Sequence, residues 1–136
     1  MADKINLDIV TPGKVVFSGP IEMVTAPGSV GEFGVLSGHA AFVTTLETGE
    51  VCIKKENRTQ YLAISGGFAE VMNDKITILA EAAEMAEEID IKRAEAAKVR
   101  AEERLKDATG EDSQFQEMEA ALQRANNRIQ VSARKT

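Results

Sequence analysis

Residues 76–105 read ITILAEAAEMAEEIDIKRAEAAKVRAEERL, and within them the hydrophobic pattern changes its period. Up to about Ala80, apolar residues alternate with polar ones, which is the period of a β-strand. From about Ala82 onward, apolar residues recur at steps of three and four, which is the period of an amphipathic helix. The sequence therefore predicts a β-rich unit followed by a helical unit.

Upstream of this change, short apolar segments follow one another with turn residues between them. Pro12-Gly13, Pro27-Gly28 and Asn73-Asp74 are dipeptides that favour turns. The alternation predicts about nine strands, at residues 5–9, 15–17, 21–25, 31–35, 42–46, 51–55, 60–64, 68–72 and 76–79. So many short strands without an intervening helix predict an antiparallel β-sandwich, or flattened barrel, over residues 1–85.

The helical unit, residues 86–136, contains two segments with heptad-like spacing. Their seam positions are Ile91, Ala94, Lys98, Ala101 and Leu105, then Phe115, Met118, Leu122, Ala125 and Ile129. Gly110 lies where it can end the first helix, and Ser113 with Gln116 has the spacing of a capping box for the second. The segments therefore predict an antiparallel α-helical hairpin.

The first seam is thin, because it contains alanines and a lysine where large aliphatic residues usually stand. Each buried alanine contributes about 1–2 kcal/mol less burial free energy than a leucine would. We expect the two helices to hold together only marginally, so that a partner can open the hairpin or peel it away.

Composition and charge exclude several classes of protein. The formal net charge is −6 and no basic run is long enough to neutralise a series of phosphates, which argues against nucleic acid as a partner. A single cysteine, Cys52, excludes an internal disulfide and any multi-cysteine metal site. The sequence has neither a signal-peptide core at its N-terminus nor an apolar run of the roughly 18 residues that a membrane span needs. We therefore expect a soluble protein of the cytoplasm or a similar compartment.

The glycine-rich stretch GEFGVLSGHAAFVT, residues 31–44, raises the question of an active site because it contains His39, the only histidine. Catalysis by His39 with Glu32 would need a nucleophile, and no serine or cysteine motif accompanies the pair. A phosphate-binding loop would need Gly-Lys-Ser/Thr before a helix, whereas Gly13-Lys14 is followed by a strand pattern. The glycines suit tight turns or close approach to another surface.

Four segments carry a resemblance to a known family. They are GEFGVLSGHAAFVTTLETGEV (31–51), YLAISGGFAEVMNDKITILAEAAE (61–84), IDIKRA (89–94) and ALQRANNRI (121–129). In this order, and over essentially the whole chain, they resemble the epsilon subunits of F-type ATP synthases. The resemblance implies a non-catalytic subunit of the central stalk, peripheral on the cytoplasmic face of a bacterial inner membrane.

The resemblance also implies partners. The sandwich would bind the gamma subunit and sit on the c-ring, and the hairpin would move between a compact and an extended form. In the extended form it would reach the alpha and beta subunits and block ATP hydrolysis. By the same resemblance, Gly31, Glu32 and Phe33 would form a loop that, with His39 beside it, faces the rotor partners. The basic tip, Arg124, Arg128, Arg134 and Lys135, would meet acidic residues of the catalytic subunits.

The segment IDIKRA supports two interpretations. From the residues alone, Asp90 is the N-cap of the first hairpin helix and Arg93 is a solvated charge on its face. In some bacterial relatives the same pattern belongs to an ATP site on the compact hairpin, while other relatives with this pattern bind ATP weakly or not detectably. The residues that the resemblance assigns to such a site are Glu84, Ile89, Asp90, Arg93, Ala94, Arg124 and Arg128. The expectation is thus that no cofactor is required and that ATP is a regulatory ligand.

Two other functions compete with this reading. One is a free-standing adaptor that senses ATP and does not accompany a rotary enzyme. The other is a small hydrolase that uses His39 and Glu32, in which replacing the histidine would abolish turnover.

Overall fold

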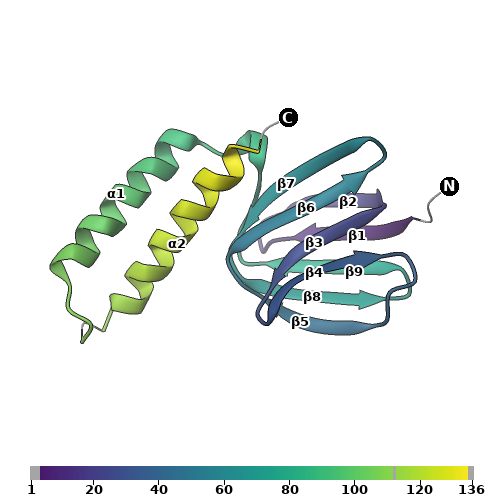
Figure 1. Ribbon diagram of the computed structural model, residues 1–136, viewed down its shortest axis with the longest axis horizontal. Helices are drawn as coiled ribbons and strands as arrows, with labels where there is room; N and C mark the ends of the chain where they lie inside the picture. Colours follow the sequence, from purple (N-terminus) through teal and green to yellow (C-terminus); the bar gives the residue numbers. More distant parts are fainter. Residues whose placement is uncertain (1–3, 112, 135–136) are drawn as a thin grey trace.

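Residues 4–111 and 113–134, the part of the chain that the computed structural model describes, form ten strands followed by two long helices (Figure 1). The strands are β1 (Ile5–Val10), β2 (Val15–Ile21), β3 (Met23–Gly28), β4 (Gly31–Leu36), β5 (Phe42–Leu46), β6 (Gly49–Lys55), β7 (Arg58–Ile64), β8 (Gly67–Met72), β9 (Lys75–Ala80) and β10 (Ala83–Met85). A 3-10 turn, η1 (Ala86–Glu88), leads to α1 (Ile91–Asp107) and α2 (Phe115–Ser132). The predicted β-sandwich followed by a helical hairpin is confirmed.

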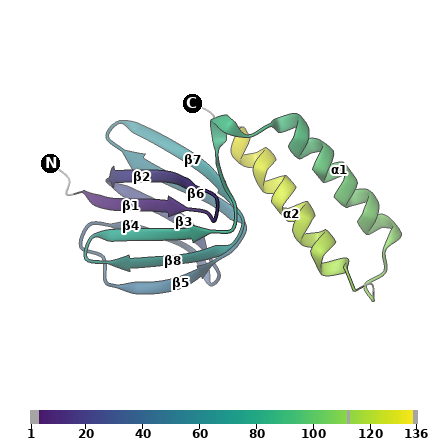
Figure 2. The same ribbon diagram turned by 180° about the vertical axis from the view of Figure 1, so that it is seen from behind.

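The strands form one continuous sheet that curls over on itself. Its order is β10-β7-β6-β3-β5-β8-β9-β1-β2, and β4 pairs with β3 beside this path. Figures 1 and 2 show the two curved halves facing one another as the layers of a sandwich. The pairs are antiparallel with one exception, because β1 runs parallel to β9. This parallel pair departs from the purely antiparallel arrangement that the short turns predicted.

The space between the layers is filled by aliphatic side chains, as the composition predicted. Along β1, Ile5, Leu7 and Ile9 are buried while the residues between them face outward. The same alternation in the other strands follows from the two-residue period of a strand, which turns every second side chain inward. The largest fully buried residues are Ile5, Leu7, Ile9, Ile21, Ile53, Leu62, Ile64, Ile76, Ile78, Val24, Val35 and Val51. The sandwich therefore has a complete core of its own.

The segment between the sandwich and α1 differs from the prediction. Residues 83–85 form strand β10, paired antiparallel with β7, although the sequence predicts a helical period from about Ala82. Alanine and glutamate favour helices, and here the backbone hydrogen bonds offered by β7 override that weak local preference. The helix begins only at Ile91, after the N-cap Asp90.

The hairpin is held together by small residues, as predicted. In α1 the buried residues are Ala94 and Ala101, and they face α2, whose Met118 and Ala125 are buried. The predicted capping residues are wrong, because α1 ends at Asp107 and the N-cap of α2 is Gln114. The side chain of Gln114 instead accepts a hydrogen bond of 3.4 Å from Arg104 of α1.

The hairpin docks on the sandwich through α2. Figures 1 and 2 both show α2 between α1 and the sheet, with its C-terminal end at β7 and η1. A small cluster of Ala63, Ala86, Ile89 and Val131, with Tyr61 packed against it, joins the two units there. This cluster is far smaller than the core of the sandwich, so the two units are joined by a limited apolar contact.

Gly67, at the start of β8, is the glycine on which the sheet depends most directly. Its φ is +130°, and a Cβ at this position would collide with the carbonyl oxygen of Leu79 and lie 2.9 Å from Cα of Ala80. We predict that Gly67→Ala lowers the free energy of unfolding by about 3 kcal/mol, because it combines backbone strain with overpacking. Urea unfolding followed by circular dichroism measures the change.

Gly13→Ala is the matched control, because no heavy atom lies within 4 Å of a Cβ built at Gly13. It should change the free energy of unfolding by less than about 0.5 kcal/mol. Equal effects of the two substitutions would contradict this account of the β8–β9 junction.

Candidate functional site

A cleft of about 650 Å³ lies where α1, α2 and one end of the sandwich meet. The turn between β1 and β2, residues 11–13, forms one wall, and the first turns of α1 form another. Six of the seven residues predicted for a nucleotide site line it, namely Glu84, Ile89, Asp90, Arg93, Ala94 and Arg128. The fold therefore brings together residues that are up to 44 positions apart in the sequence.

Arg124 is the one predicted residue that does not line this cleft. It borders a smaller neighbouring hollow of about 210 Å³ between the two helices, together with Arg100, Arg104 and Arg128. Arg100 and Arg128 line both spaces, so the cleft and the hollow adjoin. Arginines from both helices thus border two adjoining spaces, and guanidinium groups can donate charge-assisted hydrogen bonds to an anion. The carboxylates of Glu81, Glu84 and Asp90 also line the cleft, so its charges are mixed.

Arg100 was missed by the sequence analysis. It stands seven residues after Arg93, which places the two arginines two turns apart on the same face of α1. This seven-residue spacing was the signal in the sequence that could have identified Arg100 as a residue of the site. The 11–13 turn carried no such signal, since only the folded sandwich places it opposite α1.

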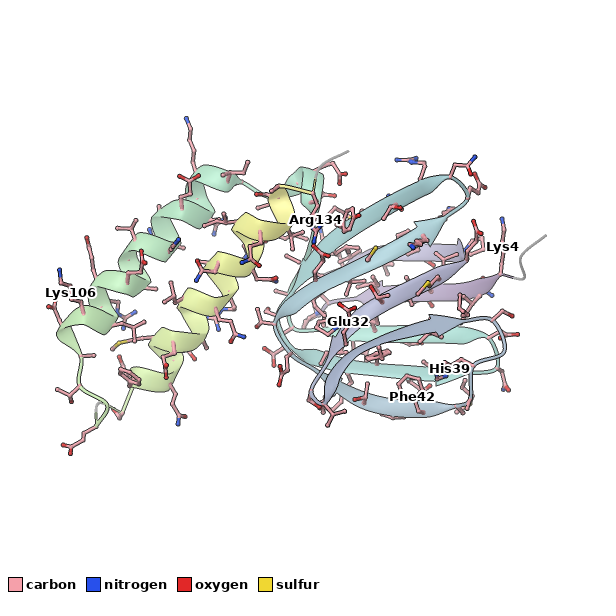
Figure 3. All side chains as sticks on the ribbon, viewed as in Figure 1. Lys4, Glu32, His39, Phe42, Lys106 and Arg134 are labelled. Carbon is pink, nitrogen blue, oxygen red and sulfur yellow. The ribbon has the colours of Figure 1, made fainter. Side chains whose placement is uncertain are left out.

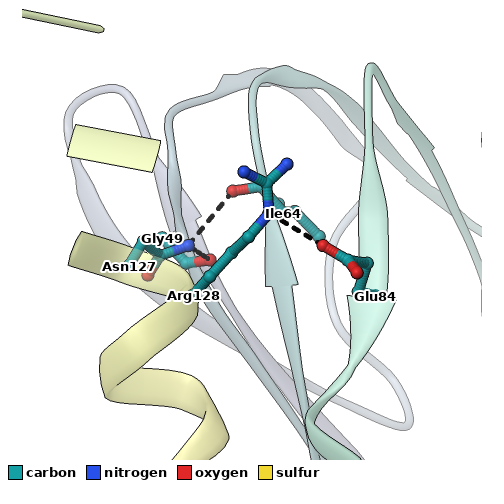
Figure 4. A network of polar contacts seen from close by, with 5 residues as sticks. All are labelled: Gly49, Ile64, Glu84, Asn127 and Arg128. Carbon is teal, nitrogen blue, oxygen red and sulfur yellow. Dashed lines mark hydrogen bonds and ion pairs between the residues drawn. The ribbon is translucent and has the colours of Figure 1, made fainter. Parts of the chain in front are cut away.

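The two arginines of α2 that were predicted for the nucleotide site are each paired with a carboxylate. Arg128 Nε donates to Glu84 Oε1 at 2.8 Å (Figure 4), and Arg124 donates to Glu117 Oε1 at 3.1 Å. About a third of the Arg128 side chain and 39% of the Glu84 side chain are exposed. Ion pairs this exposed contribute at most about 1 kcal/mol. An anion in the cleft can therefore compete with Glu84 for Arg128.

Asp90 has the structural role that the residues alone predicted. Its backbone is extended and its Oδ1 accepts a hydrogen bond of 3.0 Å from the backbone N–H of Arg93. The carboxylate thus caps α1 at the edge of the cleft. Arg93 is exposed and lines the cleft.

The predicted rotor-contact residues lie at another part of the sandwich. Gly31, Glu32 and Phe33 belong to strand β4 rather than to a loop, because they pair with residues 26–28 of β3. His39 lies in the turn that follows β4, and its ring is 5.0 Å from that of Phe42. Figure 3 shows Glu32 and His39 toward opposite ends of β4.

The separation of Glu32 and His39 excludes them as a catalytic pair. Residues 32–36 alone span about 13 Å in an extended strand, and β4 continues to Leu36 before the turn begins. The Nδ1 atom of His39 lies 2.8 Å from the carbonyl oxygen of Ala40, so a local backbone group is a hydrogen-bond partner of this ring.

The other chemical groups give no sign of catalysis. Burial raises the pKa of the Cys52 thiol, and the nearby Glu50 carboxylate raises it further, so this thiol is a poor nucleophile. Across residues 4–111 and 113–134, no group of three or more His, Cys, Asp or Glu side chains could hold a metal ion. In the same residues neither helix is long and apolar enough to cross a membrane.

The basic tip is partly docked. Arg134 donates to Glu50 Oε2 at 3.2 Å, and its guanidinium lies 5.5 Å from the ring centre of Tyr61. Lys135, the last member of the predicted tip, lies outside the described residues.

Comparison with known proteins agrees with this architecture. The beta-sandwich domain of the ATP synthase delta/epsilon chain matches residues 4–86, and the long alpha-helix domain of the same chain matches residues 87–133. The ATP synthase epsilon chain of Geotalea uraniireducens (strain Rf4) is 50% identical over 134 residues, which are 98% of this chain and 97% of that one. The ATP synthase epsilon chain of Trichlorobacter lovleyi (strain ATCC BAA-1151 / DSM 17278 / SZ) is likewise 50% identical, with the same coverage.

A similar fold occurs in a solved assembly. A chain of the Euglena gracilis mitochondrial ATP synthase, OSCP/F1/c-ring, superimposes with a TM-score of 0.80 at 26% identity. The match covers 91% of this chain and 78% of that one.

A curled β-sandwich that carries a C-terminal helical hairpin is the architecture of the two matched family domains. The chain belongs to the ATP synthase delta/epsilon chain family. Within it, the full-length likeness to epsilon chains makes it an epsilon subunit of the central stalk of an F-type ATP synthase.

Proposed function

We propose that this subunit couples gamma to the c-ring through its sandwich and inhibits ATP hydrolysis through its hairpin. The observation that carries the proposal is the unequal packing of the two units. Residues 4–85 contain a large aliphatic core, whereas the described residues of the hairpin, 86–111 and 113–134, join it through one small apolar cluster and a few polar contacts. Such a hairpin can leave the sandwich without unfolding it, as a mobile regulatory unit requires.

The outer face of the sheet supports binding to gamma. Phe68 of β8 and Leu79 of β9 face each other in register and are 55% and 52% exposed. Val10 is the partner of Leu79 on β1, and Val15 is the partner of Val10 on β2, so the apolar row continues across the sheet. Exposed apolar surface of this kind marks a protein interface. We assign this row to the gamma subunit.

The contacts with the other partners rest on the family resemblance together with the positions of the residues. Gly31, Glu32, Phe33 and His39 lie on β4 and in its following turn, and we assign them to the rotor, with Glu32 meeting c-ring loops. In the extended state the arginines of α2 would meet acidic groups of the alpha and beta subunits. The subunit would then be peripheral, on the cytoplasmic face of a bacterial inner membrane.

ATP is the ligand that we assign to the cleft. Its phosphates would pair with arginines of the two helices, with Arg128 released from Glu84, and the carboxylates of Asp90 and Glu84 would address the ribose or base. Since the cleft is formed by α1, α2 and the sandwich together, a ligand bound there favours the compact form. ATP would thereby relieve inhibition, without serving as a required cofactor.

The main test uses a core of alpha, beta and gamma subunits from a matched source. We predict that the full chain suppresses ATP hydrolysis and that a chain stopped after Glu87 binds the core without suppressing it, because β10 and the sandwich core are kept. Binding is measured by co-elution and turnover by phosphate release. If neither version binds, the central-stalk proposal is wrong. If both bind and neither inhibits, the inhibitory role of the hairpin is wrong.

A second prediction concerns ATP. Calorimetric titration of the isolated full chain should show binding that Arg93→Ala or Arg128→Ala weakens by about tenfold or more, since a hydrogen bond to a charged group contributes about 1.5–3 kcal/mol. Lys92→Ala is the control, because Lys92 neighbours Arg93 on α1 but does not line the cleft. Absence of measurable binding, or equal losses in all three variants, would contradict the assignment of ATP to this cleft.

A further inference from the structure

Asn127 of α2 makes an unusual contact with the sandwich. Its side-chain Nδ2 donates to the carbonyl oxygen of Gly49 at 2.8 Å and to that of Ile64 at 3.4 Å (Figure 4). Gly49 is the first residue of β6 and Ile64 is the last of β7, and the two are paired in register. One amide group therefore ties the helix to the ends of two neighbouring strands.

The two acceptors are held firmly in place. A Cβ added at Gly49 would lie 2.6 Å from Cβ of Pro27, so the backbone of Gly49 is packed directly against that ring. Ile64 is only 1% exposed and belongs to the core of the sandwich. Because both carbonyl groups belong to the packed sandwich, the bonds of Asn127 restrict the axial position and the rotation of α2.

Among residues 4–111 and 113–134, the other side-chain hydrogen bonds between α2 or its C-terminal end and the sandwich are ionic. They are the pairs Arg128–Glu84 and Arg134–Glu50, in which the arginine side chains are 33% and 57% exposed. Such pairs are screened by salt and can be exchanged for other ions. The bonds of Asn127 are neutral and directional, and the residue is half-buried, so they do not share this sensitivity.

We propose that Asn127 is a charge-independent latch: a positioning residue that selects the compact form of the hairpin. The inference rests on the proposed mobility of the hairpin. The latch separates the docking of α2 from ligand recognition. Asn127 keeps α2 on the sandwich while Arg128, the next residue, exchanges Glu84 for an anion in the cleft. Loss of the latch shifts the hairpin toward the extended form.

Asn127→Asp tests the latch in the full chain. The substitution keeps the size of the side chain but replaces two N–H donors by an anionic oxygen that faces two carbonyl groups. We expect the ratio of extended to compact forms to rise about tenfold, near the upper end of the roughly 2- to 13-fold effect of losing a neutral hydrogen bond. Asn127→Ala, which removes the donors without adding charge, should give a shift in the same direction of about fivefold.

Asn126→Asp is the matched control. It introduces the same charge one residue away, and Asn126 is also half-buried. It should change the ratio by no more than about twofold. Spin labels at Thr48→Cys and Gln123→Cys, in a Cys52→Ser background, report the ratio as a distance distribution. In the compact form both positions border a second hollow of about 600 Å³, which lies between α2 and the start of β6 and is distinct from the arginine-lined cleft. The shift caused by Asn127→Ala should persist at high salt.

Inhibition of ATP hydrolysis gives a second readout, because a lost latch and a damaged hairpin change the inhibition in opposite directions. A latch variant should inhibit the alpha–beta–gamma core more strongly than the unchanged chain, whereas a variant with a damaged hairpin would inhibit less. The latch is refuted if the distance distribution of both Asn127 variants matches that of Asn126→Asp. If the Asn127 variants shift the distribution and no version inhibits the core, the latch stands and the inhibitory function fails.

Discussion

The docking of α2 on the ends of β6 and β7 is the interaction on which the rest of the structure depends. The sandwich has its own aliphatic core, and α1 packs mainly against α2, so the position of the whole hairpin follows from this one contact. The arginine-lined cleft exists only while α2 is docked, because its walls come from both helices and from the sandwich. A limited contact of this kind can therefore control both a ligand site and the availability of the helices to a partner.

The difference in packing between the sandwich and the hairpin follows from the size of their buried side chains. Strands rich in isoleucine and valine bury a large apolar core, while the helices that meet through Ala94, Ala101 and Ala125 bury much less apolar surface. Under the proposed mobility of the hairpin, this thin packing would keep the free-energy difference between docked and undocked forms small, so that a ligand or a partner of ordinary affinity could reverse it.

Much of the fold could be predicted, because period and turn chemistry are local signals. They gave nine of the ten strands, the hairpin and its thin seam. They missed β10, whose alanines and glutamate are held in a strand by β7, and the parallel pair β1–β9, which depends on how the sheet curls. In the site, the family motif found six residues of the cleft. Arg100, the 11–13 turn and Asn127 were missed, since their roles depend on contacts between distant segments.

A cross-link that holds the hairpin in place would test the central claim most directly. Glu50→Cys and Arg134→Cys in a Cys52→Ser background replace two side chains whose charged groups are 3.2 Å apart, so a short, cleavable thiol reagent can join them in the compact form. The linked subunit should bind the alpha–beta–gamma core and leave ATP hydrolysis uninhibited, and cleaving the linker should restore inhibition. Equal inhibition before and after cleavage would show that the hairpin does not have to leave the sandwich, and would contradict the account.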